Sequence, residues 1–426
     1  MFKKIISILL VLMVTISMFV ASGVETFAAS YSKTNSALDK TGDYIYSTLK
    51  SPSFGSIGGE WAMYGLAIAK YDLPNSYIEK YKKTVEEAVK EGYRGTPGVL
   101  HDRKYTEYSR VIIAYSALGL DPTDIAGYNL LKYLADFDKV VWQGINGPIF
   151  ALRALDSGKY SIPKVDGISN ITTRQKLIDY IIKNQTKDGG WNLDNSVNSA
   201  SDPDITGMAL QALAPYNTQS KVKEAIKKAV ACLSSKQLKG GGYSSSGTVN
   251  SESCAQVISG LLANGINPNA DSRFIKNGNS VLDALMSFYD NNKGGFRHVN
   301  TAGSGYQPVV NQMATEQAYY ALALYFNTVP GKTTISTVTS SKAGAVKVSW
   351  KQGKVASGYQ IKVSPYKSFT KATKTVYVSG RTAVSKTVTG LAKGKTRYVK
   401  VRAYKIINGT KVYGSWSYMK KVKVKK

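Results

Sequence analysis

The stretch IDYIIKNQTKDGGWNLD, residues 178–194, decides the fold. An apolar helical pattern ends there at Gln185, two glycines follow, and Trp191 comes six residues after the glutamine. The segments CLSSKQLKGGGY (232–243) and LMSFYDNNKGGF (285–296) repeat this spacing. The glycines permit a turn at positive φ where a helix ends, and the aromatic residue packs the turn. Turns that return every 50 residues, roughly, indicate a repeat architecture built from helical pairs.

Two kinds of helix are expected to alternate along residues 30–327. One kind is rich in small residues and almost wholly apolar, so it must be buried, whereas the other has a charged face and must lie outside. Six inner helices ringed by six outer ones predict a closed α6/α6 toroid. The expected inner segments are residues 59–71, 106–122, 144–158, 202–216, 250–265 and 313–326.

The pattern changes after a linker at residues 328–332. From there apolar residues alternate with polar ones, as in AVKVSW (345–350) and RYVKVRAYKI (397–406), between turns rich in Gly, Ser and Asn. Alternation with period two is typical of strands with one buried face. Residues 333–426 are therefore predicted to form a small all-β sandwich, which makes the protein multidomain.

The first 29 residues have the character of a secretory signal peptide. Lys3 and Lys4 precede an apolar run from Ile5 to Val20, and small residues suited to cleavage follow. The rest of the sequence has no run that approaches the roughly 18 apolar residues of a spanning helix. We therefore expect a secreted protein, extracellular or associated with the cell surface, that does not span a membrane.

Positive charge is concentrated in the second region. Residues 332–426 contain 20 Lys, 3 Arg and no Asp or Glu, so they carry +23 of the net +28 and leave +5 to the rest. Such a module attracts polyanions, and salt weakens the attraction. For an exported protein the expected partner is an anionic cell-wall polymer or surface glycan, and nucleic acid is not expected.

The sequence contains few of the side chains that usually bind metal ions. His101 and His298 are its only histidines, and Cys232 and Cys254 its only cysteines. Both cysteines fall in apolar helical patterns, which favours buried thiols over a bridge. With so few nitrogen and sulfur ligands, we expect no metal site of the usual zinc kind and no cofactor.

Two resemblances follow from these residues. The pattern Y-I-x3-Q-x3-G-x-W at residues 180–191 resembles the QW repeat of terpene cyclase and protein prenyltransferase toroids, over about residues 35–326. Secreted cobalamin carriers and many bacterial surface proteins look like the same toroid. The basic region resembles a fibronectin type III domain, in which Trp350 is the core tryptophan and Leu391 with Tyr398 forms the late corner.

The cyclase resemblance extends to SDPDITGMAL, residues 201–210. It implies a class II cyclase motif in which Asp204 is the proton donor and Asp202 its neighbour, although Ile205 replaces the last acid of that motif. The residues also permit a structural interpretation. Asp202 followed by proline is suited to cap a helix, and Asp204 in the first turn complements the helix dipole.

A second group of candidates comes from helix geometry. Inner helices that alternate with outer ones all run the same way, so their N-termini meet at one mouth. Acids and aromatics there could cleave a glycan or hold a polar ligand, although each acid alone could simply pair with a helix dipole. The predicted ligand-binding residues are Trp61, Glu60, Glu107, Trp142, Trp191, Glu252 and Glu316.

The leading hypothesis is a secreted surface protein whose toroid binds a ligand, glycan or partner while the basic module associates with anionic envelope components. The alternative is an enzyme that uses the acids of the mouth, either a cyclase-like isomerase or a glycan-active hydrolase or lyase. A cobalamin-type carrier is a further alternative. The sequence leaves open whether the protein is catalytic.

Overall fold

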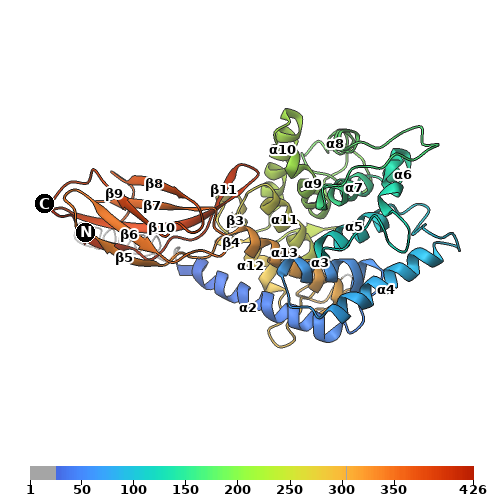
Figure 1. Cartoon of the computed structure of the whole chain (residues 1–426), viewed down its shortest axis with the longest axis horizontal. Coiled ribbons are helices and arrows are strands. Elements are labelled where there is room, and N and C mark those ends of the chain that lie inside the picture. The colour runs from blue at the N-terminus through green and yellow to red at the C-terminus, as the bar shows by residue number, and fades with distance from the viewer. Residues whose placement is uncertain (1–24, 304) are drawn as a thin grey trace, which may run out of the picture. The chain divides into compact units, whose positions relative to one another are not determined.

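Six inner helices close into a ring in the helical unit (Figure 1). The computed structural model describes residues 25–303 and 305–426. Each inner helix packs against the next, and α13 packs against α3, which confirms the predicted toroid. The inner helices are α3 (Trp61–Ala69), α5 (Thr106–Leu118), α7 (Asn146–Ser157), α9 (Pro203–Leu213), α11 (Ser251–Ala263) and α13 (Gln312–Thr328).

Amphipathic segments precede the inner helices in the chain. In α10 the buried residues include Val222, Ala229 and Leu233, which share one face, while the lysines lie on the other. The outer helices are α2 (Glu25–Thr48), α4 (Asn75–Glu91), α8 (Arg174–Lys183), α10 (Ser220–Lys236) and α12 (Val281–Ser287).

The expectation of a single amphipathic outer helix at every position is wrong at the third position. Three short pieces stand there instead: η3 (Leu130–Ala135), α6 (Phe137–Val140) and η4 (Val141–Gln143). The amide of Phe137 bonds to the carbonyl of Asn170, and the amide of Thr172 bonds to that of Ala135. The side chain of Asp136 then caps α6. This pairing of backbone segments interrupts an otherwise helical apolar pattern.

Short connecting elements complete the helical unit. A π-type turn precedes α3, one 3-10 turn follows α9, and another precedes a small hairpin. One hairpin lies between α10 and α11, and the other between α11 and α12. These elements are η2 (Ser56–Glu60), η5 (Ala214–Tyr216), η6 (Ser272–Phe274), β1 (Ser244–Ser245) with β2 (Thr248–Val249), and β3 (Ile275–Lys276) with β4 (Asn279–Ser280).

The glycine turn that defines the repeat is held by its glutamine and its tryptophan. Gln185 Nε2 donates to the carbonyl of Gly189 in its own turn, at 2.7 Å, and to that of Ala225 on α10, at 2.8 Å. Trp191 is fully buried, and its indole N–H donates to the carbonyl of Ile181 at 2.6 Å. The motif therefore joins one helical pair to the next.

The second copy keeps this chemistry with different residues. Gln237 Nε2 donates to the carbonyls of Gly241 and Phe274, each at 2.9 Å. The hydroxyl of Tyr243 donates to the carbonyl of Leu233 at 2.9 Å, ten residues back as in the first copy. In the third copy, Phe296 is buried but has no polar group to donate.

Two antiparallel sheets form the β unit. One has the order β5-β6-β9, and the other β11-β10-β7-β8, with β12 paired to β10. The strands are β5 (Ile335–Thr339), β6 (Val346–Trp350), β7 (Gly358–Ser364), β8 (Lys374–Ser379), β9 (Ser385–Val388), β10 (Thr396–Ile407), β11 (Thr410–Tyr413) and β12 (Lys420–Lys423).

The core of the sandwich contains Trp350 and Leu391, as the sequence predicts. The ring centroids of Trp350 and Tyr359 lie 5.2 Å apart. Tyr398 is only half-buried, because its neighbour Val399 takes the inward position on β10. The fold of this chain is therefore an all-α toroid followed by an all-β sandwich.

Three other expectations concern the chain ends and the cysteines. The predicted signal peptide lies outside the described residues except for positions 25–29, which begin α2. Within the described part of the chain, no helix is both long and apolar enough to cross a membrane. Cys232 and Cys254 are buried and are not joined by a disulfide.

Candidate functional site

The acids near the starts of the inner helices fall into two groups. Because an outer segment separates each inner helix from the next, all inner helices run the same way and begin on one side of the ring. The charge of Glu60 acts on Glu316, and that of Glu107 acts on Glu60. The charges of Asp202 and Glu252 act on Asp204. We therefore refer to the acids around Glu60 as the first group and to those around Asp204 as the second group.

Arg110 on α5 balances part of the first group. Its guanidinium forms an ion pair with Glu107, and its Nε lies 3.5 Å from Oε2 of Glu60. Glu60 is 1% exposed, and burial raises its pKa to about 7 although Arg110 opposes the shift. Its Oε1 accepts the amide of Gly55 at 2.9 Å. Glu60 is therefore committed to the turn before α3.

Glu316 on α13 supports the same turn. Its Oε1 accepts the Gly58 amide and the Gln312 side chain, each at 2.9 Å, and Gly58 has a φ of 74°. Its Oε2 has no hydrogen-bond partner among the described residues. Burial raises the pKa of Glu316 to about 7. Glu60 and Glu316 together fix the backbone of residues 55–58.

Asp202 and Asp204 begin α9 in the second group. Oδ1 of Asp202 accepts the amides of Asp204 at 2.8 Å and Ile205 at 3.3 Å, so Asp202 is the N-cap that its sequence context favours. Oδ1 of Asp204 is buried and has no hydrogen bond of regular geometry within the described chain, although the Ser253 side chain is near enough to oppose the rise in its pKa. Burial, with the charges of Asp202 and Glu252, raises the pKa of Asp204 to about 7. Asp204 is thus suited to hold a proton near neutral pH.

Glu252 on α11 completes the second group. Its Oε2 lies 2.8 Å from Nδ1 of His298 and accepts the hydroxyl of Ser251 at 3.0 Å, while Oε1 has no partner in the described part of the chain. Sequence reasoning missed this carboxylate–imidazole pair, because His298 follows the third glycine turn and lies far from Glu252 in the chain. The residues described contain no cluster of His, Cys, Asp and Glu suited to a metal ion.

The three predicted tryptophans lie in different environments. Trp191 is fully buried in its turn, as described above. Trp142 is 57% exposed on η4, with the guanidinium of Arg103 over its ring at 5.1 Å. Only Trp61 is surrounded by inner-helix side chains, with the rings of Phe150 and Tyr320 each 5.8 Å away.

These rings belong to a layer that fills the middle of the toroid. Gln256 Nε2 donates to Oε1 of Gln317 at 2.8 Å and to the hydroxyl of Tyr320. Gln211 donates in turn to Oε1 of Gln256 at 3.1 Å. Side chains from α3, α7, α9, α11 and α13 therefore occupy the interior next to the acidic ends.

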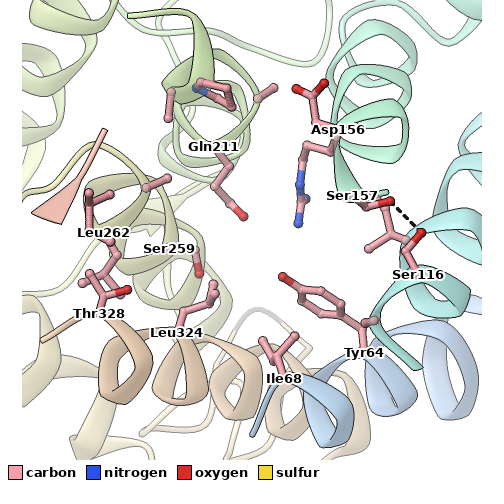
Figure 2. Close-up of a pocket in the computed structure, with 18 of the residues that line it drawn as sticks. Tyr64, Ile68, Ser116, Asp156, Ser157, Gln211, Ser259, Leu262, Leu324 and Thr328 are labelled. Atoms are coloured by element: carbon pink, nitrogen blue, oxygen red, sulfur yellow. Dashed lines mark hydrogen bonds between the residues drawn. The ribbon is translucent and has the colours of Figure 1, made fainter. Parts of the chain in front are cut away.

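A cavity of about 510 Å³ lies on the other side of this layer, among the later residues of the inner helices (Figure 2). Each of the six inner helices contributes to its lining. Ser116 on α5 and Ser157 on α7 meet at its edge through a hydrogen bond of 2.8 Å. None of the acids predicted from sequence lines this cavity, so the hollow and the acidic ends are separate features.

Comparisons with known proteins assign neither a family nor an activity to this chain. No protein-family model matches the sequence, and no curated protein matches it either. Ent-copalyl diphosphate synthase from Streptomyces platensis is similar over 62% of this chain and 50% of its own length, at 19% identity and a TM-score of 0.39.

Two solved fibronectin type III structures are similar to the second region. The FN1–FN3 domains of chicken CNTN1 match 23% of this chain and 30% of their own, at 24% identity and a TM-score of 0.20. The sixth fibronectin type III domain of human fibronectin type III domain containing protein 3 matches 22% of this chain and 86% of its own, at 18% identity and a TM-score of 0.19.

Proposed function

We propose that this chain is a secreted, surface-associated binding protein with two working modules. The basic sandwich associates with an anionic polymer of the cell envelope, and the toroid binds a separate ligand. The observation that carries the proposal is the complete absence of Asp and Glu from residues 332–426, which hold 23 basic residues. A module without internal carboxylates has to find its counter-charges in a partner or in salt.

The second sheet of the sandwich adds an aromatic feature to this charge. Lys362 on β7 is directly opposite Lys400 on β10, and Trp416 lies near both, with its centroid 5.5 and 4.7 Å from their Nζ atoms. Arg402 also faces this ring, at 4.4 Å. Partial burial and the neighbouring cations lower the pKa of Lys400. Three cations held around one indole offer both charge and a stacking surface to an anionic glycan.

Salt dependence tests this part of the proposal. The full chain should bind polygalacturonate, a uniformly anionic glycan, and should not bind dextran, a neutral one. Its affinity for polygalacturonate should fall steadily as sodium chloride rises, since the attraction is screened. Equal binding of the two glycans, or an affinity that molar salt leaves unchanged, would contradict an electrostatic association.

Acid catalysis at Asp204 is a second candidate function. It is favoured by the unpartnered Oδ1 and the raised pKa of this carboxyl group, which keep a proton available near pH 7. A cyclase-like isomerase would transfer this proton to an alkene, and a glycan-active enzyme to a glycosidic oxygen.

Turnover assays decide between binding and catalysis. The chain would be incubated with a linear isoprenoid or with polygalacturonate, beside the variants Asp204→Asn and Glu252→Gln. Product that Asp204→Asn reduces by about 100-fold or more would establish the enzyme. The binding proposal expects no product from either substrate.

A further inference from the structure

Arg153 on α7 lines the cavity without an anionic partner. No carboxylate lies within 4.0 Å of its guanidinium among the described residues, although every other arginine of the helical unit except Arg103 and Arg297 forms an ion pair. Asp156, one turn away, is already engaged, because its Oδ1 accepts Arg174 Nε and the Tyr216 hydroxyl, each at 2.9 Å. The charge of Arg153 is therefore uncompensated inside the toroid.

The surroundings of this guanidinium are mostly aromatic. It lies 5.7 Å from the centroid of Trp61 and 5.6 Å from that of Phe150. Tyr64 also interacts with it, and the Tyr64 hydroxyl points into the hollow in Figure 2. Aromatic faces attract a cation but supply no counter-ion. A partly buried charge without such a partner is costly, so an entering anion would gain a strong, charge-assisted contact.

The rest of the cavity is suited to an apolar chain. Ile68, Ile113, Leu262 and Leu324 contribute aliphatic surface, and the amide of Gln211 faces the same space. A volume of about 510 Å³ falls within the range of small-molecule sites, which are mostly apolar with a few placed polar groups. The Asp156 carboxylate also lines the cavity, but it is already bonded to Arg174 and Tyr216. The unpaired guanidinium of Arg153 beside an apolar wall is therefore the complement of an amphipathic anion.

We propose that the cavity binds a small amphipathic anion, with its carboxylate or phosphate on Arg153 and Tyr64 and its apolar part against Ile68, Ile113, Leu262 and Leu324. This assignment rests on the proposed function, which gives the toroid a ligand. It adds the chemical class of that ligand. It places the ligand away from the acids at the helix N-termini.

Calorimetric titration of the full chain tests this assignment. Octanoate and octyl phosphate serve as anionic probes and 1-octanol as the uncharged control. At least one anion should bind saturably with one site per chain, and 1-octanol more weakly. Arg153→Gln should weaken binding of the anion by about tenfold to a hundredfold, as expected for loss of a charge-assisted contact, and should leave 1-octanol unchanged. The matched control Arg94→Gln removes an exposed arginine and should change nothing.

A second variant covers the case in which Arg153→Gln does not fold. Ala117→Phe places a ring in the cavity and keeps the guanidinium, so it should abolish binding of the anion. The assignment is overturned if neither anion binds, if 1-octanol binds as well as they do, or if both variants retain wild-type affinity. Polygalacturonate binding, measured on the same samples, reports separately on the sandwich.

Discussion

Single residues in this protein show how burial gives identical carboxyl groups different roles. Glu60 and Glu316 have raised pKa values but use their oxygens on the backbone turn before α3. Asp202 caps α9 by accepting hydrogen bonds from two backbone amides. Asp204, Glu252 and Glu316 each retain one oxygen that nothing in the described chain satisfies. Of these three, Asp204 combines an unsatisfied oxygen with a raised pKa and no backbone turn to support.

The raised pKa of Asp204 predicts a specific dependence of stability on pH. Because this pKa is higher in the folded protein than in the unfolded chain, its contribution is full below about pH 4 and is lost as pH rises through about 7. The full shift corresponds to about 4 kcal/mol, and solvent relaxation reduces it. The change in unfolding free energy caused by Asp204→Asn should therefore be more favourable to the folded state at pH 8 than at pH 4. We expect the difference between the two pH values to be about 1–2 kcal/mol.

Urea denaturation at both pH values measures this difference. Asp121→Asn is the matched control, since Asp121 is exposed and its pKa is lowered by Thr123, so it should give no such gain at high pH. An Asp204→Asn variant that is equally stabilised at pH 4 and pH 8 would show that this carboxyl group is not protonated near neutrality.

At the scale of elements, the sequence specifies the ring well and the site poorly. Small apolar helices such as α11, buried along almost its whole length, could be recognised because only an inner position hides every face. The break in the third outer segment could not be recognised, because the sequence pattern of that segment is helical. The helix is interrupted there by backbone pairing with residues 170–172, which lie farther along the chain. The Glu252–His298 contact and the cavity likewise depend on distant segments, which residue spacing does not encode.

The glycine turns should differ in how much each aromatic contributes. Trp191→Phe leaves space in the core and removes the donor to the Ile181 carbonyl, so it should cost about 2–4 kcal/mol. Tyr243→Phe should cost only about 1 kcal/mol, because the Leu233 carbonyl keeps the amide of Gln237 at 3.1 Å.

Equilibrium unfolding in urea would measure both losses against Tyr366→Phe, a change at a tyrosine that is 55% exposed. If Trp191→Phe were no more destabilising than that control, the turn would not join one helical pair to the next as its hydrogen bonds indicate.

At the scale of the whole molecule, two regions of opposite design share one chain. The toroid carries acids at the starts of its inner helices and only a small net charge. The sandwich contains no Asp or Glu. It exposes lysines on both of its sheets, among them Lys347, Lys386 and Lys421. Association with a polyanion should therefore depend on where a positive charge lies, and not merely on the total.

The affinity of two triple variants for polygalacturonate at low salt tests this claim most directly. One variant changes Lys347, Lys386 and Lys421 of the sandwich to Gln, and the other changes the exposed Lys221, Lys223 and Lys228 of α10 in the same way. Both lower the net charge by three. The account predicts a loss of several-fold or more for the sandwich variant and little change for the helical one. Equal losses would contradict it.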